Sequence, residues 1–120
     1  MLSGSPTKVL IVDDHPLVLS GIRAQLEGVA GVEVVGTAAD GAAAIEASAR
    51  LEPDVVVLDI SLPDISGFEV AGRLRADHPR ARILFLTMHD DEEYVVRAVS
   101  CGAAGYLLKS ASAGELPHAI

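Results

Sequence analysis

This 120-residue sequence has no tryptophan and only one cysteine. It also lacks the sequence features of secreted and membrane proteins. A single cysteine excludes an internal disulfide and fits a reducing compartment, so we expect a cytoplasmic protein. No apolar run approaches about 18 residues, which argues against a transmembrane helix. Residues 1–6 lack a basic region followed by an apolar stretch, so they are not a secretion signal, and we expect a disordered tail.

Basic residues are also few: nine Lys and Arg stand against 17 Asp and Glu, a formal charge of −8. Such a surface repels phosphate backbones and anionic membranes, so we expect neither nucleic acid nor membrane to bind this chain alone. Only two Phe and two Tyr occur, yet half of the residues are hydrophobic. The core must therefore be aliphatic, and the length suits a single domain.

Short apolar runs alternate with segments of helical spacing along the whole chain. The apolar runs predict five strands, of which the second is expected at a sheet edge: 8–12, 32–37, 55–59, 82–87 and 104–109. Caps, spacing and breakers predict the helices between them: Pro16 to a stop at Gly31, Asp40 to Arg50, Gly67 to Pro79, Asp90 or Asp91 to Gly102, and a last, truncated one from Ser112. This alternation predicts an α/β fold with helices on both faces of a parallel sheet. We expect the flavodoxin-like (βα)5 doubly wound sandwich, with strand order 2-1-3-4-5.

Reactive polar residues stand where four of these strands end. The first strand leads into Asp13 and Asp14, and the third ends at Asp59. The fourth ends at Thr87 and the fifth at Lys109. Each alone has an ordinary explanation as a turn, cap or surface residue. Ligands of open α/β sheets bind beyond the carboxyl ends of the strands, so the joint placement predicts a site there.

The three acids would meet between the first and third strands, which lie about 4.8 Å apart if adjacent. Two carboxylates about 5 Å apart repel by roughly 3 kcal/mol at an effective dielectric constant of about 20. A hard divalent cation such as Mg²⁺ relieves that conflict. Together with the Lys109 ammonium and the Thr87 hydroxyl, the acids would form a cradle for a phosphoryl group, and Asp59 could act as the nucleophile.

At this point the sequence resembles a receiver domain of the response regulators of two-component signalling. The resemblance runs from about residue 7 to residue 120, and the segment 88–95 is similar to the nitrate-response (NarL/FixJ) branch. Four motifs carry it: Val12-Asp13-Asp14-His15, Asp59 with Leu62-Pro63 and Gly67, Leu86-Thr87, and Gly105-Tyr106-Leu107-Leu108-Lys109.

The resemblance implies roles for individual residues. Asp59 would accept the phosphoryl group. Asp14 and Asp59 would ligate Mg²⁺ directly, together with the backbone carbonyl of Ser61, and Asp13 would hold the ion through water. The loop that carries Asp59 and Ser61 would thus supply both the nucleophile and a metal ligand.

The remaining implied roles concern activation and partners. Lys109 would pair with the phosphoryl oxygens, Thr87 would move toward them, and Tyr106 would turn inward behind it. The donor would be a phosphohistidine on a sensor histidine kinase. The domain would assist its own phosphorylation and dephosphorylation without being an enzyme in its own right. Relatives of this branch carry a helix-turn-helix DNA-binding domain after the receiver, so residues 7–120 would be the receiver of a transcription regulator whose output domain is not in this chain. Whether activation forms a homodimer is left open.

The residues argue against three other functions. A haloacid-dehalogenase-type phosphatase requires a second Asp two residues after its nucleophile, and this chain has Ser61 at that position. A flavin- or dinucleotide-binding module needs a glycine-rich first turn, which is absent after Val12. A pseudo-receiver used only for protein contacts is disfavoured by the complete acid set and Lys109. The four histidines show no ligand spacing and are predicted to lie at the surface: His15, His78, His89 and His118.

Overall fold

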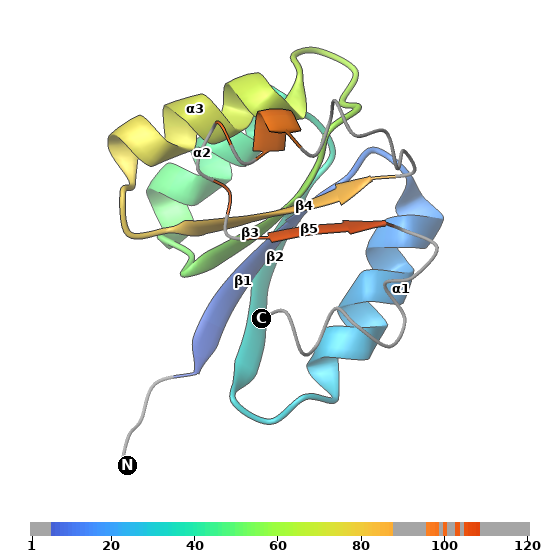
Figure 1. Ribbon diagram of the computed structural model, residues 1–120. Helices are drawn as coiled ribbons and strands as arrows, with labels where there is room; N and C mark the ends of the chain where they lie inside the picture. The colour runs from blue at the N-terminus through green and yellow to red at the C-terminus, as the bar shows by residue number, and fades with distance from the viewer. Residues whose placement is uncertain (1–5, 88–95, 99, 101–102, 104, 109–120) are drawn as a thin grey trace.

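A parallel sheet forms the centre of the structure, a computed structural model that describes residues 6–87, 96–98, 100, 103 and 105–108. Its five strands lie in the order β2-β1-β3-β4-β5, and each neighbouring pair is parallel (Figure 1). The predicted flavodoxin-like fold and strand order are therefore confirmed, with β2 at an edge. The elements are β1 (Thr7–Val12), α1 (Pro16–Glu27), β2 (Val32–Ala38), α2 (Gly41–Leu51), β3 (Val55–Asp59), α3 (Gly67–Asp77), β4 (Arg82–Thr87) and β5 (Gly105–Leu108).

Helices cover both faces of the sheet. α1 packs on one face, where Ile22 and Leu26 join one apolar cluster, and α2 and α3 pack on the other (Figure 1). Every residue of β3 is buried, as a strand enclosed on both faces requires. On the α2 and α3 face the rings of Phe68 and Phe85 lie 5.0 Å apart between centroids. Within the part of the chain that the structure describes, this ring pair lies inside an aliphatic core.

The end of α1 differs from the prediction. The helix stops before Gly28, which is its C-cap, and not at Gly31. Gly31 instead has a φ of 83° in the turn that leads into β2, a conformation that glycine adopts without strain. Val29, which was expected on the helix, follows its end and donates its N–H to the Leu26 carbonyl at 3.0 Å. The apolar face of α1 is complete at Leu26, so a further turn would add little burial.

The caps of the next two helices match their sequences. Asp40 accepts a hydrogen bond from Ala43 N at 2.7 Å at the start of α2, as predicted, and the Ser66 hydroxyl accepts one from Phe68 N at 3.1 Å at the start of α3. No helix among the described residues is both long and apolar enough to cross a bilayer.

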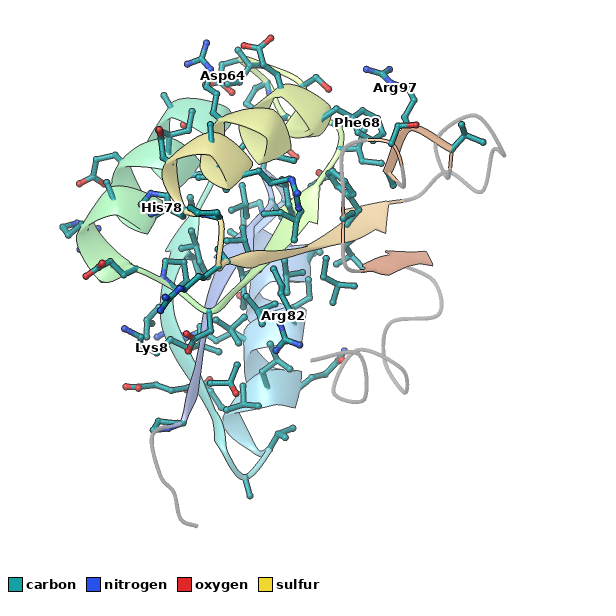
Figure 2. The ribbon with its side chains drawn as sticks, turned by 60° about the vertical axis from the view of Figure 1, so that its left-hand side comes forward. Lys8, Asp64, Phe68, His78, Arg82 and Arg97 are labelled. Atoms are coloured by element: carbon teal, nitrogen blue, oxygen red, sulfur yellow. The ribbon has the colours of Figure 1, made fainter. Side chains whose placement is uncertain are left out.

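Part of the predicted fourth helix is visible. Residues 96–98 and 100 are helical, while its predicted start and its stop at Gly102 lie outside the described residues. Arg97 places its guanidinium carbon 4.3 Å from the centre of the Phe68 ring, so this segment lies against α3 (Figure 2). The truncated last helix and residues 1–5 of the expected tail also lie outside the described residues.

Candidate functional site

Strand register brings acids from β1 and β3 side by side. Val12 pairs with Leu58, so the next residue on each chain, Asp13 and Asp59, reaches the carboxyl edge of the sheet at the same level. Asp13 is 1% exposed and Asp59 is 2% exposed, although both are acidic. The Asp14 side chain is 33% exposed. Buried carboxylates are unfavourable without compensating partners, so their pairing here marks a specialised site.

The carboxylates form one cluster with an unexpected fourth member. One oxygen from each of Asp13, Asp14 and Asp59 and one ring nitrogen of His15 all lie within 4.8 Å of one another. Nδ1 of His15 is 2.9 Å from Asp13 Oδ1 and 3.0 Å from Asp14 Oδ1. The prediction of a surface histidine is right about exposure, since the ring is 55% exposed, but it missed these contacts. The signal was available in the sequence, because a residue that directly follows two converging acids cannot lie far from them.

His15 also explains an irregularity at the start of α1. It occupies the N-cap position, yet its side chain makes no capping hydrogen bond. Its backbone N–H donates to Asp13 Oδ1 at 2.9 Å, and its ring faces the acids. The turn between β1 and α1 is therefore shaped around the carboxylate cluster and not around the helix end.

The loop after β3 orients Asp59. Ser61 N donates to Asp59 Oδ1 at 3.2 Å, and Gly67 N donates to the Ile60 carbonyl at 2.8 Å. A Cβ on Gly67 would lie 2.3 Å from the Asp59 carbonyl oxygen, so only glycine permits this approach. The first residue of α3 thus packs directly against the backbone that carries Asp59.

A second carboxylate of this loop reaches a different helix. Asp64 Oδ1 accepts from Gly41 N at 2.7 Å, and its Oδ2 accepts from Ala42 N at 2.9 Å, both at the N-terminus of α2. Oδ1 also accepts from Ile65 N at 2.8 Å. The hydrogen bond from Gly41, followed by that from Ala42, lowers the pKa of Asp64 below its ordinary value because each favours the ionised carboxylate. No sequence pattern had predicted this contact.

The other predicted site residues are placed only in part. Thr87 ends β4 one residue beyond Leu86, the register partner of Asp59, and it pairs with Leu108 of β5. Tyr106 pairs with Phe85 in the backbone ladder. The side chains of Thr87 and Tyr106, and the whole of Lys109, lie outside the described residues.

The donor set fits a small hard cation. Carboxylate oxygens are the ligands that Mg²⁺ prefers, and at about 2.1 Å from the ion its opposite ligands are about 4.2 Å apart. One oxygen from each of the three acids lies within 4.8 Å of the other two, which is close to that separation. The Nδ1 of His15 lies against two of the same oxygens, so a cation bound there would displace the ring.

Fold and site together define a doubly wound α/β domain whose acids gather at the carboxyl edge of the sheet between β1 and β3. Residues 9–120 match the family described as "Response regulator receiver domain". The chain belongs to this family of phospho-acceptor signalling domains, and its relatives are regulators of the NarL/LuxR type.

Two kinds of relative support the family. The nitrate/nitrite response regulator protein NarP of Escherichia coli (strain K12) is 42% identical over 120 residues, which is 100% of this chain and 56% of NarP. The receiver domain of the putative response regulator NarL from Mycobacterium tuberculosis superposes with a TM-score of 0.91 at 38% identity, covering 97% of this chain and 94% of that one.

The structure of a third relative was determined in the presence of a phosphoryl mimic. The isolated receiver domain of RcsB from Salmonella enterica serovar Typhimurium, in the presence of phosphomimetic BeF3−, gives a TM-score of 0.89 at 31% identity over 95% of this chain and 85% of that one. The chain spans about half the length of the curated relatives it matches.

Proposed function

We propose that this chain is a phospho-accepting switch that takes a phosphoryl group from a sensor histidine kinase onto Asp59. The observation that carries the proposal is the convergence of three acids from two strands, with Asp59 almost fully buried among them. Membership of the receiver family supports the reaction class. Like-charged acids are costly to bury side by side, so their convergence at the end of a central strand points to chemistry.

The same residues would hold Mg²⁺. Asp14, Asp59 and the Ser61 carbonyl would bind the ion directly, and Asp13 would reach it through water. When bound, the ion neutralises the crowded carboxylates and the incoming phosphoryl oxygens. The chain's own contribution is orientation, because the Ser61 N–H holds one Asp59 oxygen and directs the carboxylate.

The proposed reaction is a direct displacement at phosphorus. A carboxylate oxygen of Asp59 forms a bond to phosphorus as the phosphorus–nitrogen bond of the donor phosphohistidine breaks, and the departing imidazole takes up a proton. The product is an acyl phosphate on Asp59. Attack by water on the same phosphorus would later return the carboxylate and release inorganic phosphate. The domain therefore assists its own phosphorylation and dephosphorylation.

Activation would proceed through residues of the neighbouring strands β4 and β5 and of the segment after β5. Lys109 would pair with the phosphoryl oxygens, Thr87 would move toward them, and Tyr106 would turn inward. The backbone register supports this set, since Thr87 stands one residue beyond the level of Asp59 and pairs with the residue that precedes Lys109. The resulting change would regulate an attached DNA-binding domain and so transcription in the cytoplasm. A homodimer formed on activation belongs to the same proposal.

Intact-mass spectrometry tests the proposal. With Mg²⁺ and acetyl phosphate or phosphoramidate, the chain should gain one phosphoryl group, and Asp59→Asn should gain none because an amide is not a nucleophile here. Asp77→Asn makes the same chemical change on an exposed turn of α3 and should be phosphorylated like the parent. Absence of a mass gain in the parent, with EDTA and Mg²⁺ samples alike, would support the pseudo-receiver alternative.

The family match argues against two of the alternative functions, the phosphatase and the cofactor-binding module. A haloacid-dehalogenase-type phosphatase and a flavin- or dinucleotide-binding module both belong to families other than the one matched over residues 9–120.

A further inference from the structure

A long-range contact joins the loop between β3 and α3 to the N-terminus of α2. The carboxylate of Asp64 accepts hydrogen bonds from the first two backbone N–H groups of α2, at 2.7 and 2.9 Å. We propose that Asp64 is a positioning residue that fastens this loop to α2 and thereby keeps Ser61 and Asp59 oriented for Mg²⁺ and for the phosphoryl group. This inference rests on the proposed function and names a residue that acts on the same site from outside it.

The contact is more than a helix cap, because α2 already has one. Asp40, which directly precedes the helix, accepts the hydrogen bond from Ala43 N at 2.7 Å. Asp64 takes the two earlier donors, Gly41 N and Ala42 N, from 23 and 22 residues farther along the chain. A capping residue supplied by a neighbouring loop joins two segments, whereas Asp40 joins α2 only to its own start.

Apolar packing beneath the carboxylate fixes the same junction. A Cβ added to Gly41 would lie 2.4 Å from Cγ1 of Ile65 and 2.9 Å from Cγ2 of Val70. Ile65 directly follows Asp64, so its side chain lies against the α2 N-terminus while the carboxylate binds the backbone N–H groups. The loop is therefore fastened by a polar and an apolar contact on adjacent residues.

The fastened loop leads straight to the acid cluster. Three residues before Asp64, Ser61 donates its N–H to Asp59 Oδ1 at 3.2 Å. Gly67 anchors the other end of the loop through its hydrogen bond to the Ile60 carbonyl at 2.8 Å. Between these anchors Asp64 makes the polar contact to α2, while Ile65 and Leu62 pack against the apolar cluster that α2 shares. Loss of the carboxylate would remove the polar contact and let the Ser61 peptide shift relative to Asp59. Groups that orient metal ligands from outside typically change metal affinity by about 10- to 100-fold.

The exposure of Asp64 separates this role from a purely structural one. Its carboxylate faces solvent, so water can replace its hydrogen bonds and the expected effect on overall stability is small. The effect should appear instead in the affinity for Mg²⁺ and in the rate of phosphorylation. A residue that only stabilised α2 would change neither at temperatures where the protein stays folded.

The test compares Asp64→Ala with Asp40→Ala by calorimetric titration with Mg²⁺ and by the initial rate of phosphorylation from phosphoramidate. Both variants remove a capping carboxylate from α2, but only Asp64→Ala releases the loop. We expect Asp64→Ala to bind Mg²⁺ about tenfold more weakly, with a matching loss of rate. Asp40→Ala should keep the parent affinity even if it lowers the melting temperature. Equal affinities in the two variants would overturn the inference.

A conservative variant and a local probe complete the design. Asp64→Asn keeps one oxygen that can accept from Gly41 N, so it should recover part of the lost affinity. Hydrogen–deuterium exchange over residues 60–66 should rise in Asp64→Ala and not in Asp40→Ala, and unchanged exchange would also overturn the inference. If the parent gains no phosphoryl group, the proposed function fails, and the positioning role that rests on it fails as well. If the parent is phosphorylated and Asp64→Ala behaves like Asp40→Ala, only the positioning role fails.

Discussion

The two ends of the central sheet use acidic residues in opposite ways. At the amino end, Asp54 accepts a hydrogen bond from Lys8 N at 2.8 Å through its carboxylate, while its own backbone bonds to Lys8 O at 2.8 Å and to Arg82 N at 2.9 Å. At the carboxyl end, Asp13 and Asp59 are buried beside each other. In Figure 2 Lys8 and Arg82 lie well apart from Asp64, which belongs to the loop after β3.

The difference follows from strand direction. At the amino end a single acid, Asp54, stands just before β3, and its carboxylate accepts from the N–H of Lys8 on the neighbouring strand β1. At the carboxyl end the acids of neighbouring strands arrive together, so their like charges crowd. The amino end also has a pocket of about 340 Å³ lined by Asp54, His78 and Arg80 among others, where both signs of charge occur. Crowding of one sign, and not concavity, therefore marks the site in this fold.

Magnesium binding should separate the two ends most strongly. Asp13→Asn removes one charge from the cluster and should weaken Mg²⁺ binding by about 10- to 100-fold. Asp54→Asn makes the same change at the amino end and should leave the affinity as in the parent. Calorimetric titration measures both, with EDTA-treated protein as the starting state. A parent-like affinity in Asp13→Asn would place the ion elsewhere.

Without metal, substitutions at the two ends should change the free energy of unfolding in opposite directions. In EDTA, Asp13→Asn removes repulsion between buried carboxylates, which we expect to raise the free energy of unfolding by about 1 kcal/mol, below the ceiling of about 3 kcal/mol for such a pair. Asp54→Ala removes the acceptor of Lys8 N and should lower it by about 1 kcal/mol. Urea unfolding midpoints at an unchanged slope measure both effects. Two changes of the same sign would contradict the contrast between the ends.

The smallest expected effect concerns pH and the loop beside the cluster. Because hydrogen bonds from Gly41 and Ala42 lower the pKa of Asp64, its ionised form stabilises the fold at pH values above its ordinary pKa. That contribution is lost as the pH falls from about 4, where unfolded aspartates titrate, through the lowered pKa. The stability difference between the parent and Asp64→Asn should therefore be constant from pH 7 to about 5 and vanish at lower pH. Urea unfolding at several pH values measures it, and a difference that persists in acid would contradict the assignment.

The sequence predicted the parts of this structure that depend on local pattern. The buried valines of β3, the Asp40 cap and the convergence of Asp13 and Asp59 all follow from strand periodicity, capping chemistry and the direction of parallel strands. Even the edge position of β2 was indicated by its incomplete alternation. The predicted end of α1 was wrong because Gly28 and Gly31 can both end a helix, and only packing against the sheet decides between them.

Contacts between distant segments were missed. The Asp64 carboxylate reaches α2 only because the β3–α3 loop folds over that helix, and nothing within a few residues of Asp64 signals it. His15 differs, because its contacts with Asp13 and Asp14 are local in sequence; the lack of ligand spacing among the histidines predicted only its exposure. The roles of Lys109, Thr87 and Tyr106 stay predictions.

The pairing of β1 with β3 has a consequence for the order of events during synthesis. Asp13 and Asp14 are synthesised before Asp59, and the cluster exists only after β3 has inserted beside β1. Pairing of segments so far apart in the sequence carries a loop-closure cost that local contacts do not. A partly folded chain in which β3 has not yet joined β1 therefore has no assembled acid cluster.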